Sequence, residues 1–419
     1  METESAIQEI ARDCYSRLLA IVASRTYDLA VAEDALGDAF HAALRQWPNE
    51  GVPRSPEAWL LAVAKRRLMD EQRRKSTRDE AELLLCVTVE LDVLEAANRP
   101  DHSSVVPDER LKLLFVCTHP AIDVAARTPL MLQVVLGLDA ARIASAFLVA
   151  PSALSQRLVR AKAKIRSARI PFTVPEGPEL ADRLESVLEA IYAAYGAGWD
   201  DAVIADGPRR ELTGEAIWLA RVLAQLMPDE PESLGLLALL LYCEARQPAR
   251  RDERGNYIPL KEQNTSLWSR ITISEAEGFL SSASRHKRPG RFQLEAAIQS
   301  AHASRAFTGS TPWSAIVELY RELLRIAPTI GAHVAYSGAL LQSGDPQAAF
   351  RELESIAQSD FTNYQPYWAA KAQTLFALGN PSEASAAAER AAGLTQDAAV
   401  RRFLIKLVPP SSGGLSPAG

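Results

Sequence analysis

The sequence predicts an all-α protein made of several small helical domains, and three observations lead to this prediction. Apolar residues recur at helical spacing in almost every segment, whereas the alternating pattern of a half-buried strand is scarce. The 419 residues are too many for a single core, because domains usually hold roughly 100–200 residues, so two to four domains are expected. Apolar residues make up 47% of the chain, which is enough for most of it to fold.

The first domain is predicted over residues 1–78 as a bundle of three helices. Its second helix should span 30–47 and end within the stretch 47–51, which contains proline and glycine. Ser55 and Pro56 then fit the N-cap and the first position of a third helix, because the missing N–H of proline is not needed there. The first helix is predicted from an apolar stripe made of Ile7, Ile10, Tyr15, Leu18, Leu19, Val22 and Tyr27.

The rest of the chain divides by composition. Residues 79–107 are rich in acids and are expected to form a connector, and 108–170 should form a second small helical bundle. Three prolines between 171 and 178 indicate a short, stiff linker. Residues 179–408 are rich in alanine and leucine and predict a larger helical domain, and 409–419 are expected to be a disordered tail.

Residues 138–166 predict a helix, a tight turn and a second helix with a basic face. Ile143 and Phe147 lie at helical spacing, Val149 marks the turn, and Pro151 suits the first turn of the next helix. A helix-turn-helix places such a second helix in the major groove, with polar residues on base edges and cations on phosphates. The alternative is a solvated basic helix in an all-helical core. The residues left for a partner are Ser152, Ser155, Gln156, Arg157, Arg160, Lys162 and Lys164.

Positive charge is also concentrated at the end of the first domain. The chain as a whole has a net charge of −6, so it is not basic throughout. Binding to phosphates depends on local cations rather than on the net charge, so this cluster is a candidate nucleic-acid contact. The cluster consists of Lys65, Arg66, Arg67, Arg73, Arg74, Lys75 and Arg78.

A repeat with an offset of 35 residues is visible near the end of the chain. Small residues and a turn of glycine, a polar residue and proline recur, which is tetratricopeptide-like spacing. A generic bundle of helical hairpins is the alternative. Residues 301–328 could be a third unit, with a longer turn. The matching pairs are Ser337 with Ala372, Leu340 with Leu375, Gly344 with Gly379, Ala349 with Ala384, and Leu353 with Ala388.

Concave surfaces of such repeats bind peptides, so this domain could take a protein or a small signal as its ligand. The polar stretch 247–268 interrupts the helical pattern before the repeats. Arg246 directly precedes this stretch, and Arg250, Arg251 and Arg254 lie within it. These four arginines could form a ligand site, although a solvated loop is the favoured interpretation.

Several classes of protein are disfavoured by the sequence. The cysteines at 14, 86, 117 and 243 are far apart and form no paired motif, so neither a structural zinc site nor a disulfide framework is expected. The N-terminus has no signal-peptide pattern, and the most apolar run, 234–242, is too short to span a membrane. A cytoplasmic protein that does not bind membranes is the expectation.

No enzymatic motif is present. The sequence has no P-loop, no dinucleotide-binding glycine pattern, no zinc-protease motif and no nucleophile elbow. Cys117 and His119 are two residues apart, so they would not share a helix face and do not predict a nucleophile with its base. We therefore expect no catalytic residue, no bound metal and no cofactor.

Three segments together resemble bacterial sigma factors. Residues 32–40 resemble the helix that binds core RNA polymerase, 56–74 resemble the helix that recognises the −10 promoter element, and the helix-turn-helix resembles the domain that reads the −35 element. Their order and spacing are similar to the extracytoplasmic-function (ECF) group, which keeps only regions 2 and 4. Residues 108–120 and 157–166 resemble one subgroup, which carries a long tetratricopeptide-like extension. The resemblance covers nearly the whole chain.

This resemblance implies roles for individual residues. Core polymerase would be bound by Asp34, Leu36, Asp38 and Phe40. The −10 element would be contacted by Trp59, Lys65, Arg66, Arg73 and Arg74, with the loop 49–55 holding a flipped base, and the −35 element by the helix-turn-helix residues named above. Asp34 and Asp38 are four residues apart and therefore share a helix face, which suits a basic polymerase surface.

Other interpretations of the same residues stay open. The helix 32–40 could be an ordinary amphipathic core helix, and Trp59 could lie in the core rather than stack on a base. The whole chain could be a helix-turn-helix regulator with a tetratricopeptide-like sensor, which would bind DNA without replacing a sigma factor. The acidic helix followed by a basic one favours the sigma factor. The extension would then regulate or support activity by packing on the first two domains, so the expected partners are core RNA polymerase and promoter DNA.

Overall fold

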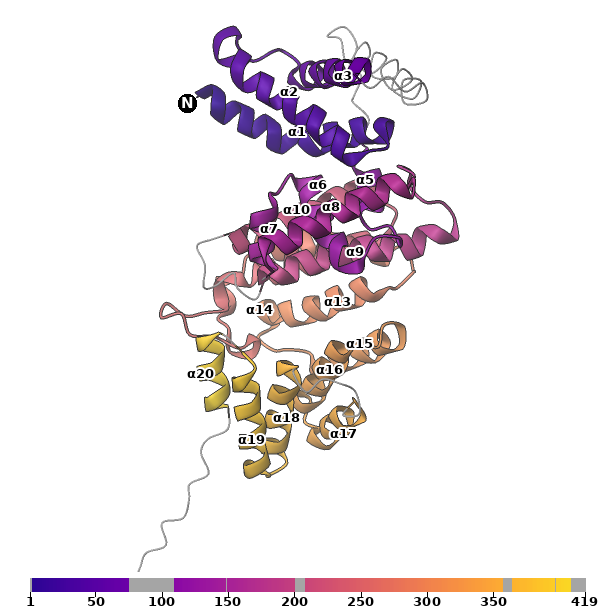
Figure 1. Cartoon of the computed structure of the whole chain (residues 1–419). Coiled ribbons are helices and arrows are strands. Elements are labelled where there is room, and N and C mark those ends of the chain that lie inside the picture. The colour runs from indigo at the N-terminus through magenta and orange to yellow at the C-terminus, as the bar shows by residue number, and fades with distance from the viewer. Residues whose placement is uncertain are drawn as a thin grey trace, which may run out of the picture. The chain divides into compact units, whose positions relative to one another are not determined.

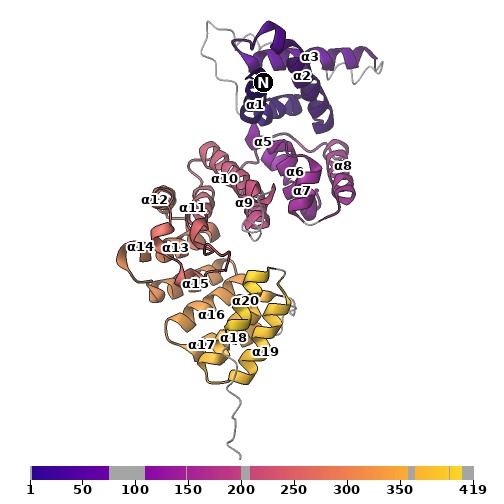
Figure 2. The ribbon, with the colours of Figure 1, turned by 90° about the vertical axis from the view of Figure 1, so that its left-hand side faces the viewer.

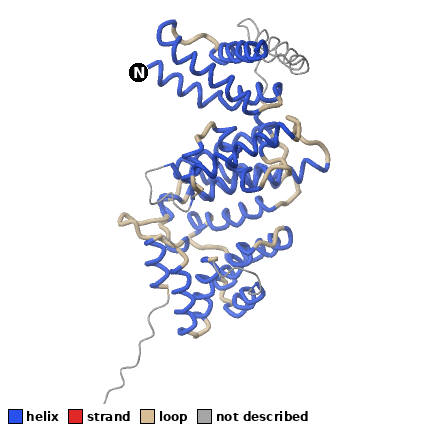
Figure 3. The backbone as a smooth tube through the Cα atoms, in the orientation of Figure 1, coloured by secondary structure: helices blue, strands red, loops and turns tan. Residues whose placement is uncertain are grey.

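A computed structural model describes residues 2–74, 109–147, 149–199, 208–356, 364–395 and 397–407. The predicted connector 79–107 and the predicted tail 409–419 lie outside these residues. Secondary structure in the described ranges is helical, apart from one isolated antiparallel bridge between Arg251 and Tyr257 (Figure 3). The prediction of an all-α protein is confirmed.

The chain divides into two compact units, residues 1–219 and 220–419, and the boundary falls inside α10, which is labelled in Figure 1. Unit 1 contains α1 (Glu2–Thr26), α2 (Leu29–Glu50), α3 (Pro56–Arg74), α5 (Arg110–Cys117), α6 (Val124–Leu136), α7 (Ala140–Ala146), α8 (Pro151–Ser167), α9 (Pro178–Trp199) and most of α10 (Pro208–Leu226).

The first three helices pack against one another as the predicted bundle. The side chain of Asp28 caps α2 by accepting a hydrogen bond from the N–H of Ala30 at 3.0 Å. The helix continues past Pro48 to Glu50, so its expected end at residue 47 is wrong by three residues. Proline removes only one helical hydrogen bond here, and the helix ends instead where Gly51 takes the left-handed φ of 84°. The next helix begins at Pro56, as predicted.

Helices α5–α8 contain the predicted helix-turn-helix. The N–H of Val149 donates to the carbonyl of Ala144 at 3.0 Å in the turn, and α8 then starts with Pro151 in its first turn. Leu154, Leu158, Ala161 and Ile165 are the buried side chains of α8, and they lie on one face. The opposite face is therefore free to carry the polar and basic residues.

Helix α9 packs on α5 and α6, although the sequence predicts that it begins the C-terminal domain. Arg183 on α9 is buried, and its guanidinium donates to the carbonyl of Phe115 at 2.7 Å. On α10, the ring of Trp218 lies 5.4 Å from the guanidinium of Arg110. The expected boundary at residue 179 thus does not coincide with the boundary between the two units, which lies after Leu219.

Unit 2 begins within α10. Its helices are α11 (Pro231–Ala245), α12 (Arg270–Ser284), α13 (Arg291–Ala303), α14 (Arg305–Thr308), α15 (Trp313–Ile326), α16 (Ile330–Gln342), α17 (Pro346–Ile356), α18 (Gln365–Ala377), α19 (Pro381–Gly393) and α20 (Ala398–Lys406), with short 3₁₀ turns η1 (Gln247–Ala249), η2 (Leu260–Glu262) and η3 (Thr265–Leu267).

The repeat predicted from the 35-residue offset corresponds to two helical hairpins, α16 with α17 and α18 with α19, and α20 packs on α19 (Figure 2). Gly344 and Gly379 occupy the two turns with φ of 95° and 81°, a conformation that favours glycine. The proline that follows each turn starts the second helix. Ala349, Ala372 and Ala384 are fully buried where the paired helices approach closely.

The stretch from Arg246 to Trp268 is packed at several positions and exposed at others, so the favoured interpretation of a solvated loop holds for Arg254 but not for Arg246 or Arg251. Arg246 is only 8% exposed, and Arg251 forms a largely buried ion pair with Asp397 at the start of α20. The ring of Tyr257 lies 5.3 Å from that of Phe403 on the same helix. These long-range contacts hold the stretch against α20, and no local sequence pattern could have revealed them.

Candidate functional site

The exposed surface of α2 is acidic. Asp34 and Asp38 are exposed, and Asp38 pairs with Arg67 of α3 at 3.5 Å, with both side chains more than half exposed. Phe40 is partly buried, and its ring lies 6.1 Å from that of Tyr15. Leu36 is fully buried, because two residues along a helix turn the side chain about 200° away from Asp34. Leu36 therefore packs beneath the acidic surface and is not part of its exposed face.

The candidate −10 residues lie on α3. Trp59 is half-buried and packs edge-on against the buried Trp47 with ring centroids 5.3 Å apart, so it belongs in part to the core. Lys65 is partly buried, and the exposed Arg66 donates from Nε to the carbonyl of Ala62 at 3.3 Å. The side chains of Arg73 and Arg74 lie outside the described residues. Asn49 and Glu50, expected in the loop, are the last residues of α2.

Helix α8 presents polar residues at its start and cations along one face. Ser152, Ser155 and Gln156 are exposed in its first two turns. Farther along, Arg160 and Lys164 are exposed and Arg157 is half-buried. These three cations line a cavity of about 250 Å³ beside the start of α6. The arrangement has the polarity that reading DNA with a recognition helix requires.

Lys162 does not lie with these cations. Its ammonium pairs with the carboxylate of Glu33 on α2 at 2.5 Å, and the two side chains are only 15% and 19% exposed. One turn farther along α8, Arg166 pairs with Asp28 at 3.3 Å. Residues 162 and 166 are four apart and share a face that differs from that of Arg160 and Lys164. In this arrangement the ammonium of Lys162 is engaged by Glu33, and its expected contact with the −35 element stays a prediction.

The Glu33–Lys162 pair lies at a buried junction of helices. Burial raises the pKa of Glu33, and the positive charge of Lys162 only partly offsets this effect. Burial, together with the negative charge of Glu33, also raises the pKa of Tyr15 on α1. The Cys117 thiol at the end of α5 is fully buried, and burial raises its pKa, which favours the protonated thiol. The sequence contains each of these residues, but nothing local predicts that they meet.

Within the described residues, no three His, Cys, Asp or Glu side chains lie close enough together to hold a metal ion. In the same part of the chain, no helix has the length and apolar character needed to cross a membrane.

Comparison with known proteins supports the resemblance of the N-terminal helices to a sigma factor. Residues 10–78, which contain α2, α3 and most of α1, match sigma-70 region 2. Residues 183–284 match a family of unknown function, DUF6596. An uncharacterized protein of Rhizobium meliloti is 37% identical over 381 residues, which cover 90% of this chain and 89% of that protein. No solved structure matches the chain significantly. The chain therefore belongs to the same family as this Rhizobium meliloti protein, with a sigma-70 region 2 domain at its N-terminus and the DUF6596 domain toward its C-terminus.

Proposed function

We propose that this chain is a sigma factor of the ECF type, which binds core RNA polymerase and directs promoter-specific initiation of transcription. The observation that carries the proposal is the match of residues 10–78 to sigma-70 region 2, which implies binding to core RNA polymerase. A sigma factor is an initiation subunit and not a catalyst, and this agrees with the lack of enzymatic motifs.

The acidic face of α2 is the proposed contact with the polymerase. Asp34 and Asp38 are both exposed, and a matching basic surface would attract them and fix the orientation of the complex. Among the described residues, Asp38 pairs with Arg67, and this exposed pair contributes little stability and is easily exchanged for a new partner.

Promoter recognition is proposed for α3 and α8. The exposed Arg66 would contact the −10 element, and Ser155, Gln156 and Arg160 would contact the −35 element. Neither contact needs high affinity, because attachment to the polymerase raises the effective concentration of the other. The buried pair of Lys162 with Glu33 joins α8 to α2, so we infer that the two helices separate before both are used.

The C-terminal helices are proposed to regulate or support this activity. The DUF6596 match spans residues 183–284 and thus crosses the boundary between the two units. The effect of a ligand bound to the repeats of unit 2 would then reach unit 1 through that continuous segment.

Reconstitution with core polymerase tests the proposal. The full chain is expected to bind core enzyme and to yield discrete transcripts from a genomic template that core enzyme alone does not yield. The double variant Asp34→Lys with Asp38→Lys should weaken binding to core enzyme at least tenfold, because it reverses the charge of the α2 face. A matched control, Glu176→Lys with Asp182→Lys, makes the same change in charge at exposed positions of unit 1 outside α2.

The outcomes separate the two candidate functions. A chain that binds promoter duplexes by itself, and neither binds core enzyme nor changes its transcripts, would be a helix-turn-helix regulator. Equal loss of polymerase binding in the control variant would show that total charge, and not the α2 face, governs association.

A further inference from the structure

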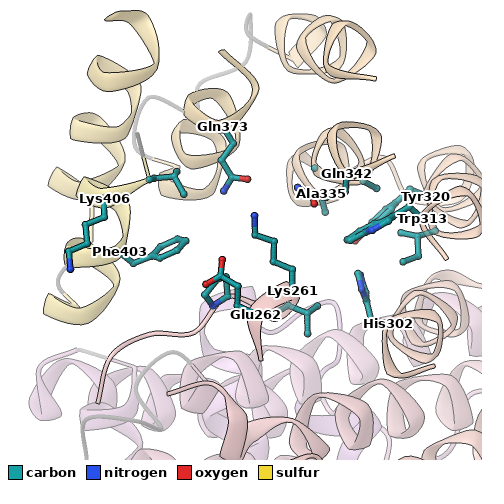
Figure 4. Close-up of a pocket in the computed structure, with 16 residues that line it drawn as sticks. Lys261, Glu262, His302, Trp313, Tyr320, Ala335, Gln342, Gln373, Phe403 and Lys406 are labelled. Carbon is teal, nitrogen blue, oxygen red and sulfur yellow. The ribbon is translucent and has the colours of Figure 1, made fainter. Parts of the chain in front are cut away.

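Unit 2 contains an open cavity of about 430 Å³ between the loop 259–262 and the helices α13, α15, α16, α18 and α20 (Figure 4). Lys261, Gln373 and Phe403 point toward its centre from three different elements. Lys261, Glu262, Gln342 and Lys406 are exposed, so the cavity opens to solvent at its edge. Its volume lies in the range of about 300–1,000 Å³ that is typical of ligand sites.

Charged side chains line the cavity. Lys261 points toward its centre, whereas the ammonium of Lys406, at the edge, points away from it (Figure 4). Neither lysine forms an ion pair among the described residues, and Glu262 is the acid among the lining residues. His302 also lines the wall. Burial and the positive charges of Arg246 and Arg305 lower the pKa of His302 to about 4, so this ring is neutral near pH 7. The positive potential therefore comes from fixed charges and does not depend on a histidine.

Arg246 adds to this charge from behind the wall. It is 8% exposed, and its guanidinium donates to the carbonyl of Tyr242 at 3.2 Å and to Oε1 of Gln299 at 2.5 Å. A third, longer contact reaches Sγ of Cys243 at 3.8 Å, and no carboxylate in the described part of the chain pairs with Arg246. A buried cation with neutral hydrogen-bond partners contributes a positive potential that favours an anionic ligand nearby, and at Tyr320 the negative charge of Glu295, which pairs with Arg291, acts in the opposite direction.

Arg305 holds the loop that presents Lys261. Its guanidinium donates to the backbone carbonyls of Leu260 and Gln263, each at 2.9 Å, and to that of Lys261. The same guanidinium lies 5.1 Å from the ring of Trp268. One side chain thus fixes three carbonyl groups of the loop, so the loop is ordered before a ligand arrives and less entropy is lost on binding.

The uncharged part of the lining suits a peptide. Trp313 and Tyr320 on α15 offer an apolar aromatic surface opposite Phe403. On α16, the small residues Ala335, Gly338 and Ala339 line the cavity and leave room for a backbone. The side-chain amides of Gln342 and Gln373 can each donate to and accept from a peptide group. The lining therefore combines sites for a carboxylate, an apolar side chain and a main chain.

We propose that this cavity binds an acidic peptide segment of a partner protein, with a carboxylate on Lys261 and an apolar side chain among Trp313, Tyr320 and Phe403. Charge complementarity selects the acid, and the two glutamine amides select an extended main chain over a compact anion. The inference rests on unit 2 alone and stands whether or not the chain is a sigma factor.

An array of random 12-residue peptides, probed with the labelled full-length chain, tests the proposal. Bound peptides are expected to be enriched in Asp and Glu with a nearby aromatic or aliphatic residue, and to bind less tightly as salt is raised. The strongest of them, synthesised and labelled, should bind the Lys261→Glu variant at least tenfold more weakly by fluorescence polarisation. The matched control is Arg351→Glu, an equal change in charge at an exposed position of α17, which does not line the cavity.

Three results would overturn the proposal. The array could yield no bound peptide or peptides without an excess of acids, or the Lys261→Glu variant could bind as tightly as the unaltered chain. Citrate and inorganic phosphate serve as the probes for a small anion. Binding of either one that depends on Lys261, with no peptide bound, would identify a small-molecule site instead.

Discussion

His302 lies in the wall of the cavity of unit 2, where burial and two neighbouring arginines lower its pKa to about 4. The ordinary pKa of histidine, near 6.5, applies to the unfolded chain. Between these two values the unfolded chain binds a proton that the folded chain does not bind. The free energy of unfolding must therefore decrease as the pH falls from 6.5 toward 4, and His302 has no such effect above that window.

We predict that His302→Gln removes this part of the pH dependence. Between pH 7 and pH 4.5, the unaltered chain should lose on the order of 2–3 kcal/mol more stability than the variant, from one pKa shift of this size. Urea unfolding of both full-length chains at the two pH values, followed by tryptophan fluorescence, measures the difference. Identical losses in the two chains would show that His302 is not responsible.

At the scale of helices, the Glu33–Lys162 pair joins α2 to α8 with both side chains largely buried. Removing one partner of a buried pair leaves an unpaired charge and typically costs about 3–5 kcal/mol. We predict that Glu33→Lys separates the two helices and increases amide hydrogen exchange in α8 at least tenfold. The double variant Glu33→Lys with Lys162→Glu should restore protection, because the pair is rebuilt in reverse.

The exposed pair of Asp38 with Arg67 provides the comparison for that experiment. Both of its side chains are more than half exposed, so Arg67→Glu should change exchange in α8 little. If Glu33→Lys left exchange in α8 unchanged, the ion pair would not hold these helices together. If the double variant stayed as open as the single one, packing rather than charge would explain the effect.

The turns of the repeats allow a prediction of a different kind. Gly379 has a φ of 81°, and a Cβ added there would meet no atom within 4 Å, so only backbone strain opposes a side chain. Gly379→Ala should therefore lower the free energy of unfolding by about 1–2 kcal/mol. Gly393, within α19 and also without close neighbours, is the control, since Gly393→Ala should be neutral or stabilising. Thermal unfolding of both variants measures this, and equal destabilisation would contradict it.

For the molecule as a whole, the features that depend on nearby residues could be predicted from the sequence. The helices, the start of α8 at Pro151 and the turns at Gly344 and Gly379 follow from spacing and from the conformations that proline and glycine favour. What could not be predicted depends on contacts between distant residues. Nothing near Lys162 indicates that its partner lies 129 residues earlier in the chain, and nothing near Arg246 indicates that it is buried.

The boundary between the two units could not be predicted from nearby residues either, because it depends on which helices α9 packs against. Apolar side chains of α9 are buried in unit 1, where the helix packs on α5 and α6, and Arg183 bonds to Phe115. The branched aliphatic residues among them are Leu184, Val187, Leu188 and Ile191. Each such side chain contributes about 1.5–3 kcal/mol when it is fully buried, so their sum is comparable to the 5–15 kcal/mol that stabilises an ordinary domain.

We therefore predict that a fragment of residues 1–178, cut at the boundary that composition suggests, loses cooperative unfolding or aggregates. A fragment of residues 1–226 keeps α9 and α10, and it should unfold cooperatively and retain binding to core RNA polymerase. Circular dichroism during heating and size-exclusion chromatography distinguish the two fragments. In the full-length chain, Arg183→Ala should be destabilising on its own, because it leaves the buried carbonyl of Phe115 without its donor. Equal stability of the two fragments would mean that α9 is dispensable for unit 1, and the boundary suggested by composition would then be the physical one.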